Sequence, residues 1–154
     1  MYLAVVILTM VLLPLGSIAV EHGLHGAAPL MGLVGKWFVF WGVGVRLGLA
    51  GGRQVLQPGF TARDIFRLED EGALPLVREL GVANLGAGLV GLLSLARPSF
   101  ILPLAISAGL FYGYAGVQHL VERPRTRNEA VAMVSDLFMA VVLAAVVGFA
   151  VFRG

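Results

Sequence analysis

The chain has 154 residues, of which 58% are hydrophobic and only 13% are charged, and this excludes an ordinary soluble domain, whose charged share is about a quarter. The formal net charge is +2, but the basic residues gather mainly in two loops, which is typical of membrane topology and not of nucleic-acid binding. The absence of cysteine excludes disulfides, thiolate metal sites and dithiol redox chemistry.

The first predicted span covers residues 2–20, which are apolar throughout and of the length that crosses a hydrocarbon layer roughly 30 Å thick. A signal peptide is the alternative, because Ser17 and Ala19 resemble a cleavage site, but no basic region precedes the apolar run. Pro14 is expected to kink this helix or to break its last turn, because proline lacks a backbone donor.

A short turn is predicted for residues 21–29, which are rich in glycine and end in proline. His22 and His25 lie in this turn with the spacing of a possible ligand pair. Such a pair converges on one metal ion only in a helix, and Gly23 and Gly26 argue against a helix here, so no metal site is predicted.

The segment 36–58 decides the topology, because it is apolar enough for lipid yet carries Lys36 and Arg46. It could span the bilayer or lie along its surface. Glycines recur every four residues, at Gly44, Gly48 and Gly52. This spacing lets helix backbones approach closely inside a bilayer, whereas a helix lying in the interface has no use for it. A second span over residues 29–52 is therefore favoured, which gives five spans, with four spans as the alternative.

The longest polar stretch, residues 53–74, follows this span. Thr61 with Asp64 three residues later resembles a capping box, and a short apolar stripe follows. These features predict a short helix lying on the membrane surface, with a solvated loop of no fixed structure as the alternative.

Three further spans are predicted, at residues 75–95, 99–121 and 128–151. Gly109 and Gly113 repeat the four-residue spacing and are expected to pack against a neighbouring helix. Thr126 with Glu129 forms a second possible capping box at the start of the last span.

Orientation follows from the arginines near the ends of the spans. Most of them lie in or beside the loops 53–74 and 122–127, which fall on the same side with either four or five spans. The positive-inside rule then places both loops in the cytoplasm. With five spans, the N-terminus is cytoplasmic and the C-terminus lies on the other side.

Charged groups deep in the spans are costly, by about 2.5 to 3.5 kcal/mol each, so they usually face a partner or a cavity. Helix rise places Arg46 roughly 10 Å and Asp136 roughly 12 Å from the same membrane face. One intramembrane polar cluster is therefore predicted, formed by Arg46, Glu79, Asn84, Tyr114, Gln118, His119 and Asp136.

Two interpretations of this cluster remain open. In one, Arg46 and Asp136 form a structural ion pair. In the other, the cluster binds a polar head such as a quinone carbonyl or a lipid phosphate, and His119 or Tyr114 donates a hydrogen bond. No catalytic motif is present in the sequence, so no catalytic residue is predicted.

Four runs of sequence suggest a family: VRLGLAGGRQVLQPG, RELGVANLGAGLVGLLSL, LFYGYAGVQHL and NEAVAMVSDLFMAVVLAAVV. Over residues 36–150 the chain resembles the DoxX-like bacterial membrane proteins. The resemblance implies a compact four-helix membrane bundle in the bacterial cytoplasmic membrane, here with an extra N-terminal helix of residues 2–20. Some DoxX relatives are subunits of quinone-reducing oxidoreductases, and others are membrane partners in redox or stress assemblies.

Two functions follow as hypotheses. The first is a non-catalytic integral membrane subunit that packs against other membrane proteins in an energy-transducing or redox complex and holds no cofactor alone. The second is a quinone- or lipid-binding component of an oxidoreductase, with the ligand beside Arg46, His119 and Asp136. A transporter is disfavoured, because no inverted repeat is detectable. The expected partners are the lipid bilayer and other membrane subunits, and no nucleic acid.

Overall fold

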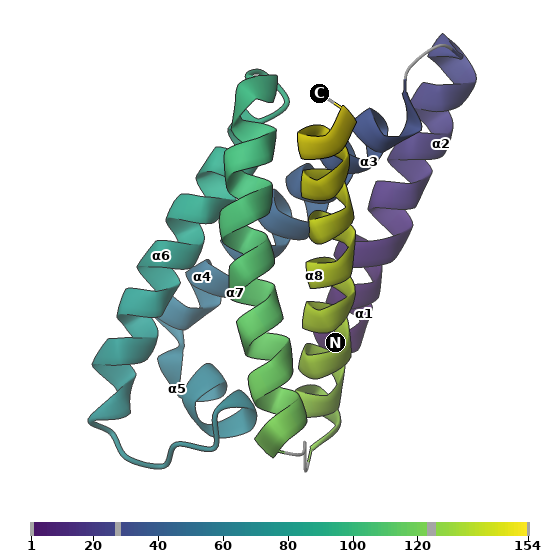
Figure 1. Ribbon diagram of the computed structural model, residues 1–154. Helices are drawn as coiled ribbons and strands as arrows, with labels where there is room; N and C mark the ends of the chain where they lie inside the picture. Colours follow the sequence, from purple (N-terminus) through teal and green to yellow (C-terminus); the bar gives the residue numbers. More distant parts are fainter. Residues whose placement is uncertain (1, 27–28, 123–125, 154) are drawn as a thin grey trace.

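The computed structural model describes residues 2–26, 29–122 and 126–153, most of which are helical (Figure 1). Five helices are long and apolar enough to cross a membrane: Tyr2–Leu24, Leu30–Leu56, Ala73–Leu93, Pro98–Glu122 and Arg127–Phe152. Successive helices run in opposite directions, so the segment 57–72, the last turn of the fourth long helix and the first turn of the fifth lie at the same end of the bundle (Figure 1). The predicted all-α membrane fold is confirmed, and the five-helix arrangement holds.

The first long helix consists of α1 (Tyr2–Ile7), a π-helical turn η1 (Leu8–Leu12) and α2 (Leu13–His25). Pro14 does not break this helix. Proline has no backbone N–H to donate, and the wider π-helical turn before Pro14 accommodates the interrupted hydrogen-bond pattern. The predicted turn at 21–29 is wrong in its first part, since helical structure continues to His25. Gly26, at φ 49°, ends the helix and donates its N–H to the carbonyl of His22.

The second long helix consists of α3 (Leu30–Phe38), a π-helical stretch η2 (Val39–Val45) and α4 (Arg46–Leu56). It crosses the bundle obliquely, from the connection after α2 to the end that holds α5 (Figure 1). This helix therefore packs within the bundle, as expected for the second span and not for a segment lying along the bilayer surface. Near its start, Lys36 Nζ donates to Glu21 Oε1 at 2.7 Å and Trp37 Nε1 donates to Glu21 Oε2 at 2.7 Å. These bonds tie the second helix to the first.

Glycines bring the second helix against α6 (Ala73–Leu93). Three pairs meet in antiparallel register: Gly44 with Gly91, Gly48 with Gly88, and Gly51 with Gly81. A Cβ atom at Gly91 would lie 2.5 Å from the Cα of Gly44, and one at Gly88 would lie 2.7 Å from the Cα of Gly48. Contacts this short leave room only for glycine, so this interface fixes the position of the second helix.

The predicted glycine ridge is correct at Gly44 and wrong at Gly52. At Gly48 the backbone lies against Gly88, but a Cβ atom on Gly48 itself would meet nothing within 4 Å. A Cβ atom at Gly52 would meet nothing within 4 Å, whereas one at Gly51 would lie 2.6 Å from the carbonyl oxygen of Gly81. A helix has 3.6 residues per turn, so a strict four-residue step drifts off the contact face, and the true ridge steps by four and then by three.

The remaining two long helices, α7 (Ile101–Glu122, preceded by the 3₁₀ turn η4, Pro98–Phe100) and α8 (Arg127–Arg153), pack side by side. Cβ atoms at Gly109 and Gly113 would lie 3.5 Å from Leu143 and 3.8 Å from Ala140, which confirms both as packing positions. The closest approach was not predicted: it lies at Gly116, where a Cβ atom would meet Leu137 at 2.8 Å.

The start of α8 is capped as predicted. The N–H of Glu129 donates to Thr126 Oγ1, and the N–H of Thr126 donates to Glu129 Oε2, each at 3.1 Å. The Glu129 side chain is fully buried, and its other oxygen accepts a hydrogen bond at 2.6 Å from Arg67 Nε. This ion pair joins α8 to the segment before α6.

That segment contains α5 (Pro58–Phe60) and a π-helical turn η3 (Thr61–Ile65), and it covers one end of the bundle (Figure 1). The predicted short helical segment exists, and it packs against the bundle, since Thr61 and Ala62 are buried. The predicted Thr61 capping box is wrong: Phe60 precedes the turn as its cap residue, and no side chain caps it.

Candidate functional site: a cavity between the helices

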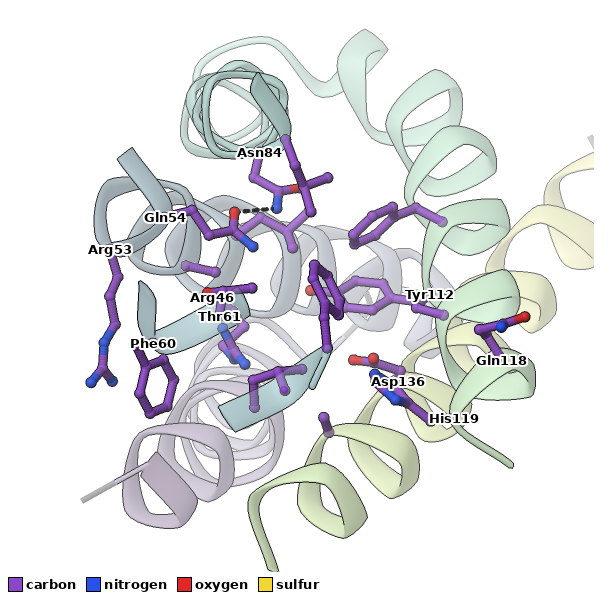
Figure 2. A pocket seen from close by; sticks show the side chains of 18 of the residues that line it. Arg46, Arg53, Gln54, Phe60, Thr61, Asn84, Tyr112, Gln118, His119 and Asp136 are labelled. Carbon is purple, nitrogen blue, oxygen red and sulfur yellow. Dashed lines mark hydrogen bonds between the residues drawn. The ribbon is translucent and has the colours of Figure 1, made fainter. Parts of the chain in front are cut away.

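A cavity of about 640 Å³ lies beneath the α5–η3 segment, between the first helix, α4, α6, α7 and α8 (Figure 2). This volume is in the range of small-molecule sites. Much of the lining is aromatic: Tyr2, Phe60, Phe66, Phe111, Tyr112 and Tyr114. Six of the seven predicted cluster residues also line it: Arg46, Asn84, Tyr114, Gln118, His119 and Asp136.

Arg46 enters the cavity from the junction of η2 and α4. Its Nη2 donates to the hydroxyl of Tyr2 at 3.1 Å, and its guanidinium lies 5.5 Å from the centre of the Tyr2 ring. Its Nε is buried without a hydrogen-bond partner. The predicted Arg46–Asp136 ion pair is not formed within 4.0 Å, so Tyr2 of the first helix is the partner of Arg46.

Two more polar groups face the cavity unsatisfied. Asp136 on α8 has no hydrogen bond or ion pair to any residue that the structure describes. His119 on α7 is buried, and its Nδ1 has no partner. Asp136 is partly exposed, whereas Arg46 Nε and His119 Nδ1 are buried. Leaving buried polar atoms unpaired is costly, so native proteins rarely do it without a functional reason. Arg46, His119 and Asp136 together leave both donor and acceptor capacity open to a ligand.

Other polar groups of the lining are satisfied within the protein. Asn84 Nδ2 donates to Gln54 Oε1 at 2.8 Å, and both side chains are buried at the α4–α6 interface (Figure 2). The Tyr112 hydroxyl donates at 2.6 Å to the carbonyl of Gly42, within the π-helical stretch that precedes Arg46. Tyr112 therefore offers a ligand its ring, while its hydroxyl holds η2 in place.

The sequence-based cluster omitted Tyr2, Gln54 and Tyr112. Gln54 could have been found, because it lies eight residues after Arg46, about 80° further around the helix and so within one broad helix face. Tyr2 gave no comparable signal, since the first helix is apolar on all sides.

The outer rim of the cavity holds Tyr114, Gln118 and Glu122 on α7, all of which are exposed. Gln118 Nε2 donates to Glu122, one turn away. Glu79 is exposed and does not line the cavity, so its predicted place in the cluster is wrong. Five residues separate it from Asn84, which turns the two side chains about 140° apart on the helix.

Of the comparisons with known proteins, one gives a match, and it extends over nearly the whole chain. Residues 1–153 match the model of a family of unknown function, DUF6790. The chain belongs to this family. No curated protein matches the chain, and no solved structure matches it. The resemblance of residues 36–150 of this chain to DoxX-like proteins therefore stays a prediction.

Proposed function

We propose that this membrane protein binds a quinone in the cavity between its helices. The observation that carries the proposal is a pair of buried nitrogens without hydrogen-bond partners, Arg46 Nε and His119 Nδ1, beside one aromatic-lined space of about 640 Å³ that the carboxyl group of Asp136 also borders. A quinone carbonyl accepts hydrogen bonds, which suits Arg46 and a protonated nitrogen of His119. The hydroxyl of the reduced form donates, which suits the carboxylate of Asp136.

Two features favour a quinone over a lipid phosphate, the other polar head considered for this cluster. Asp136 carries a carboxyl group that repels a phosphate when ionised, whereas a neutral ring tolerates both Arg46 and Asp136. The rings of Phe111 and Tyr112 line the cavity, and aromatic side chains pack favourably against a planar ring.

The setting of this function is also proposed. The DoxX-like resemblance supports a role in a redox complex of the bacterial cytoplasmic membrane, with electrons supplied by another subunit. The loops 53–74 and 122–127 would face the cytoplasm, because most of the arginines lie in or near them. A non-catalytic subunit that binds no quinone remains the rival hypothesis.

Quinone retention tests the proposal. The protein is purified in lipid nanodiscs, and the bound quinone is extracted and quantified per chain. We expect close to one quinone per wild-type chain, and at least tenfold less in Arg46→Gln, His119→Ala and Asp136→Asn. Glu79→Gln is the matched control, because Glu79 is exposed outside the cavity.

Two results would contradict quinone binding. One is a wild-type protein that holds no quinone even after incubation with excess. The other is equal retention in the wild type and all three cavity variants. Co-purification with a large assembly but without quinone would favour the non-catalytic subunit.

A further inference from the structure

The cavity reaches the outer surface of the bundle beside α7. Tyr114 on α7 lines the cavity and is also 75% exposed on the outer surface, and Leu80 on α6 lines it as well. The two helices make few contacts and diverge toward the end that holds α5 (Figure 1). Both are long and apolar enough to span a membrane, so this opening faces the hydrocarbon layer.

The outer surface beside the opening is apolar. Exposed aliphatic side chains flank it on both helices: Leu76, Leu110, Val117 and Val121. An apolar chain that leaves the cavity beside these aliphatic side chains would pass among lipid tails, while the polar rim residues Gln118 and Glu122 lie further along α7 than Tyr114.

The end of the cavity beneath the α5–η3 segment is covered in large part by protein contacts, and only Phe66 and Leu68 of its lining there are exposed, by 38% and 44%. The backbone N–H of Leu68 donates to the carbonyl of Ala62 at 2.8 Å, and Arg67 holds the buried Glu129 of α8. Beside it, the ring of Phe60 lies 6.2 Å from that of Tyr2 and 3.5 Å from the Arg53 guanidinium. These contacts cover the cavity on its loop side.

We infer that the ligand is a membrane-borne quinone with a long apolar tail, and that it enters sideways from the bilayer between α6 and α7. This inference rests on the proposed function. The ring reaches Arg46, His119 and Asp136, while the tail extends past Leu80 and Tyr114 into the lipid. The open edge thus selects a tailed quinone dissolved in the membrane over a water-soluble one.

Photolabelling tests this route. An isoprenoid quinone with a diazirine at the end of its tail is added to the protein in nanodiscs and irradiated, and the labelled residues are mapped by mass spectrometry. We expect label on the facing surfaces of α6 and α7, around Leu80 and Tyr114, that excess unlabelled quinone removes. Arg46→Gln should lose this competed label.

A mouth variant gives a second readout. Leu80→Trp adds bulk at the opening and should slow quinone loading at least fivefold. Leu89→Trp is the control, because Leu89 is exposed on the same helix but does not line the cavity. Equal loading rates in the two variants would contradict the lateral route.

The labelling outcomes separate the two proposals. Competed label on residues 57–68, or around Leu49, an exposed lining residue of α4, would overturn the α6–α7 route and leave the quinone site standing. No competed label anywhere would overturn the quinone site itself.

Discussion

Lys36 and Arg46 both lie within the second helix, and their charges have different surroundings. Lys36 has its ammonium 2.7 Å from Glu21, which also accepts a hydrogen bond from Trp37. Arg46 has only a hydroxyl contact, to Tyr2, and its Nε is buried without a partner. Asp136, which borders the same cavity, has no partner among the described residues.

This difference separates structure from function. Burying a charge is costly anywhere in a membrane, and the pair Lys36–Glu21 offsets that cost within the chain. Arg46 and Asp136 could have done the same, but they border one cavity and form no ion pair with each other within 4.0 Å. Polar groups arranged in this way can form hydrogen bonds and ionic contacts with a bound ligand.

The largest effect on stability is expected where the second helix packs against α6, because this contact positions both Lys36 and Arg46. Gly88→Ala puts a Cβ atom 2.7 Å from the Cα of Gly48, so the backbones must separate, and we expect a loss of about 2 to 3 kcal/mol in unfolding free energy. Thermal unfolding in detergent measures it. Gly86→Ala is the control, because a Cβ atom there meets nothing within 4 Å. Equal stability of the two variants would contradict the glycine interface.

Features that repeat along the chain were predictable from the sequence. Hydropathy and length gave the five long helices, and the small residues Gly109 and Gly113 were correctly expected at a helix contact. The capping box of Thr126 and Glu129 was found because it depends only on neighbours in sequence.

Features that depend on the rotation of one helix against another were not predictable. The first helix is apolar all round, so nothing in its pattern shows that Tyr2 turns toward Arg46. For the same reason Asp136 was wrongly expected to pair with Arg46. Two residues at the same depth in the membrane meet only if their helices also turn the two side chains toward each other. The partner of Lys36 was missed because Glu21 was assigned to a turn.

The next largest effect is expected at a polar contact that is satisfied although it borders the cavity. Asn84→Ala leaves the buried Gln54 amide oxygen without its donor, which should cost about 1 to 3 kcal/mol. The double variant Asn84→Leu with Gln54→Leu should recover part of this loss, because neither polar group then remains unpaired. A double-mutant cycle measures the coupling, and strictly additive losses would contradict it.

A smaller effect is expected at the paired end of the second helix. Lys36→Met leaves Glu21 without its ammonium partner, and since both side chains are partly exposed we expect a loss of about 1 to 2 kcal/mol. Quinone retention should not change, because Lys36 lies outside the cavity. Loss of quinone in Lys36→Met would contradict the conclusion that the Lys36–Glu21 pair is structural and separate from the quinone site.

The most direct measurement is the stability of the wild type, Arg46→Gln and Asp136→Asn with and without quinone. At a quinone concentration about a hundredfold above Kd, binding should stabilise the wild type by about 2.7 kcal/mol. Without quinone, Asp136→Asn should be as stable as the wild type or more so, because it removes a charge that has no partner among the described residues. Arg46→Gln should lose only its contact with Tyr2, and quinone should no longer stabilise either variant. If Asp136→Asn unfolds as readily as Lys36→Met and quinone stabilises neither the wild type nor the variants, the unpaired groups are structural and the proposed site is wrong.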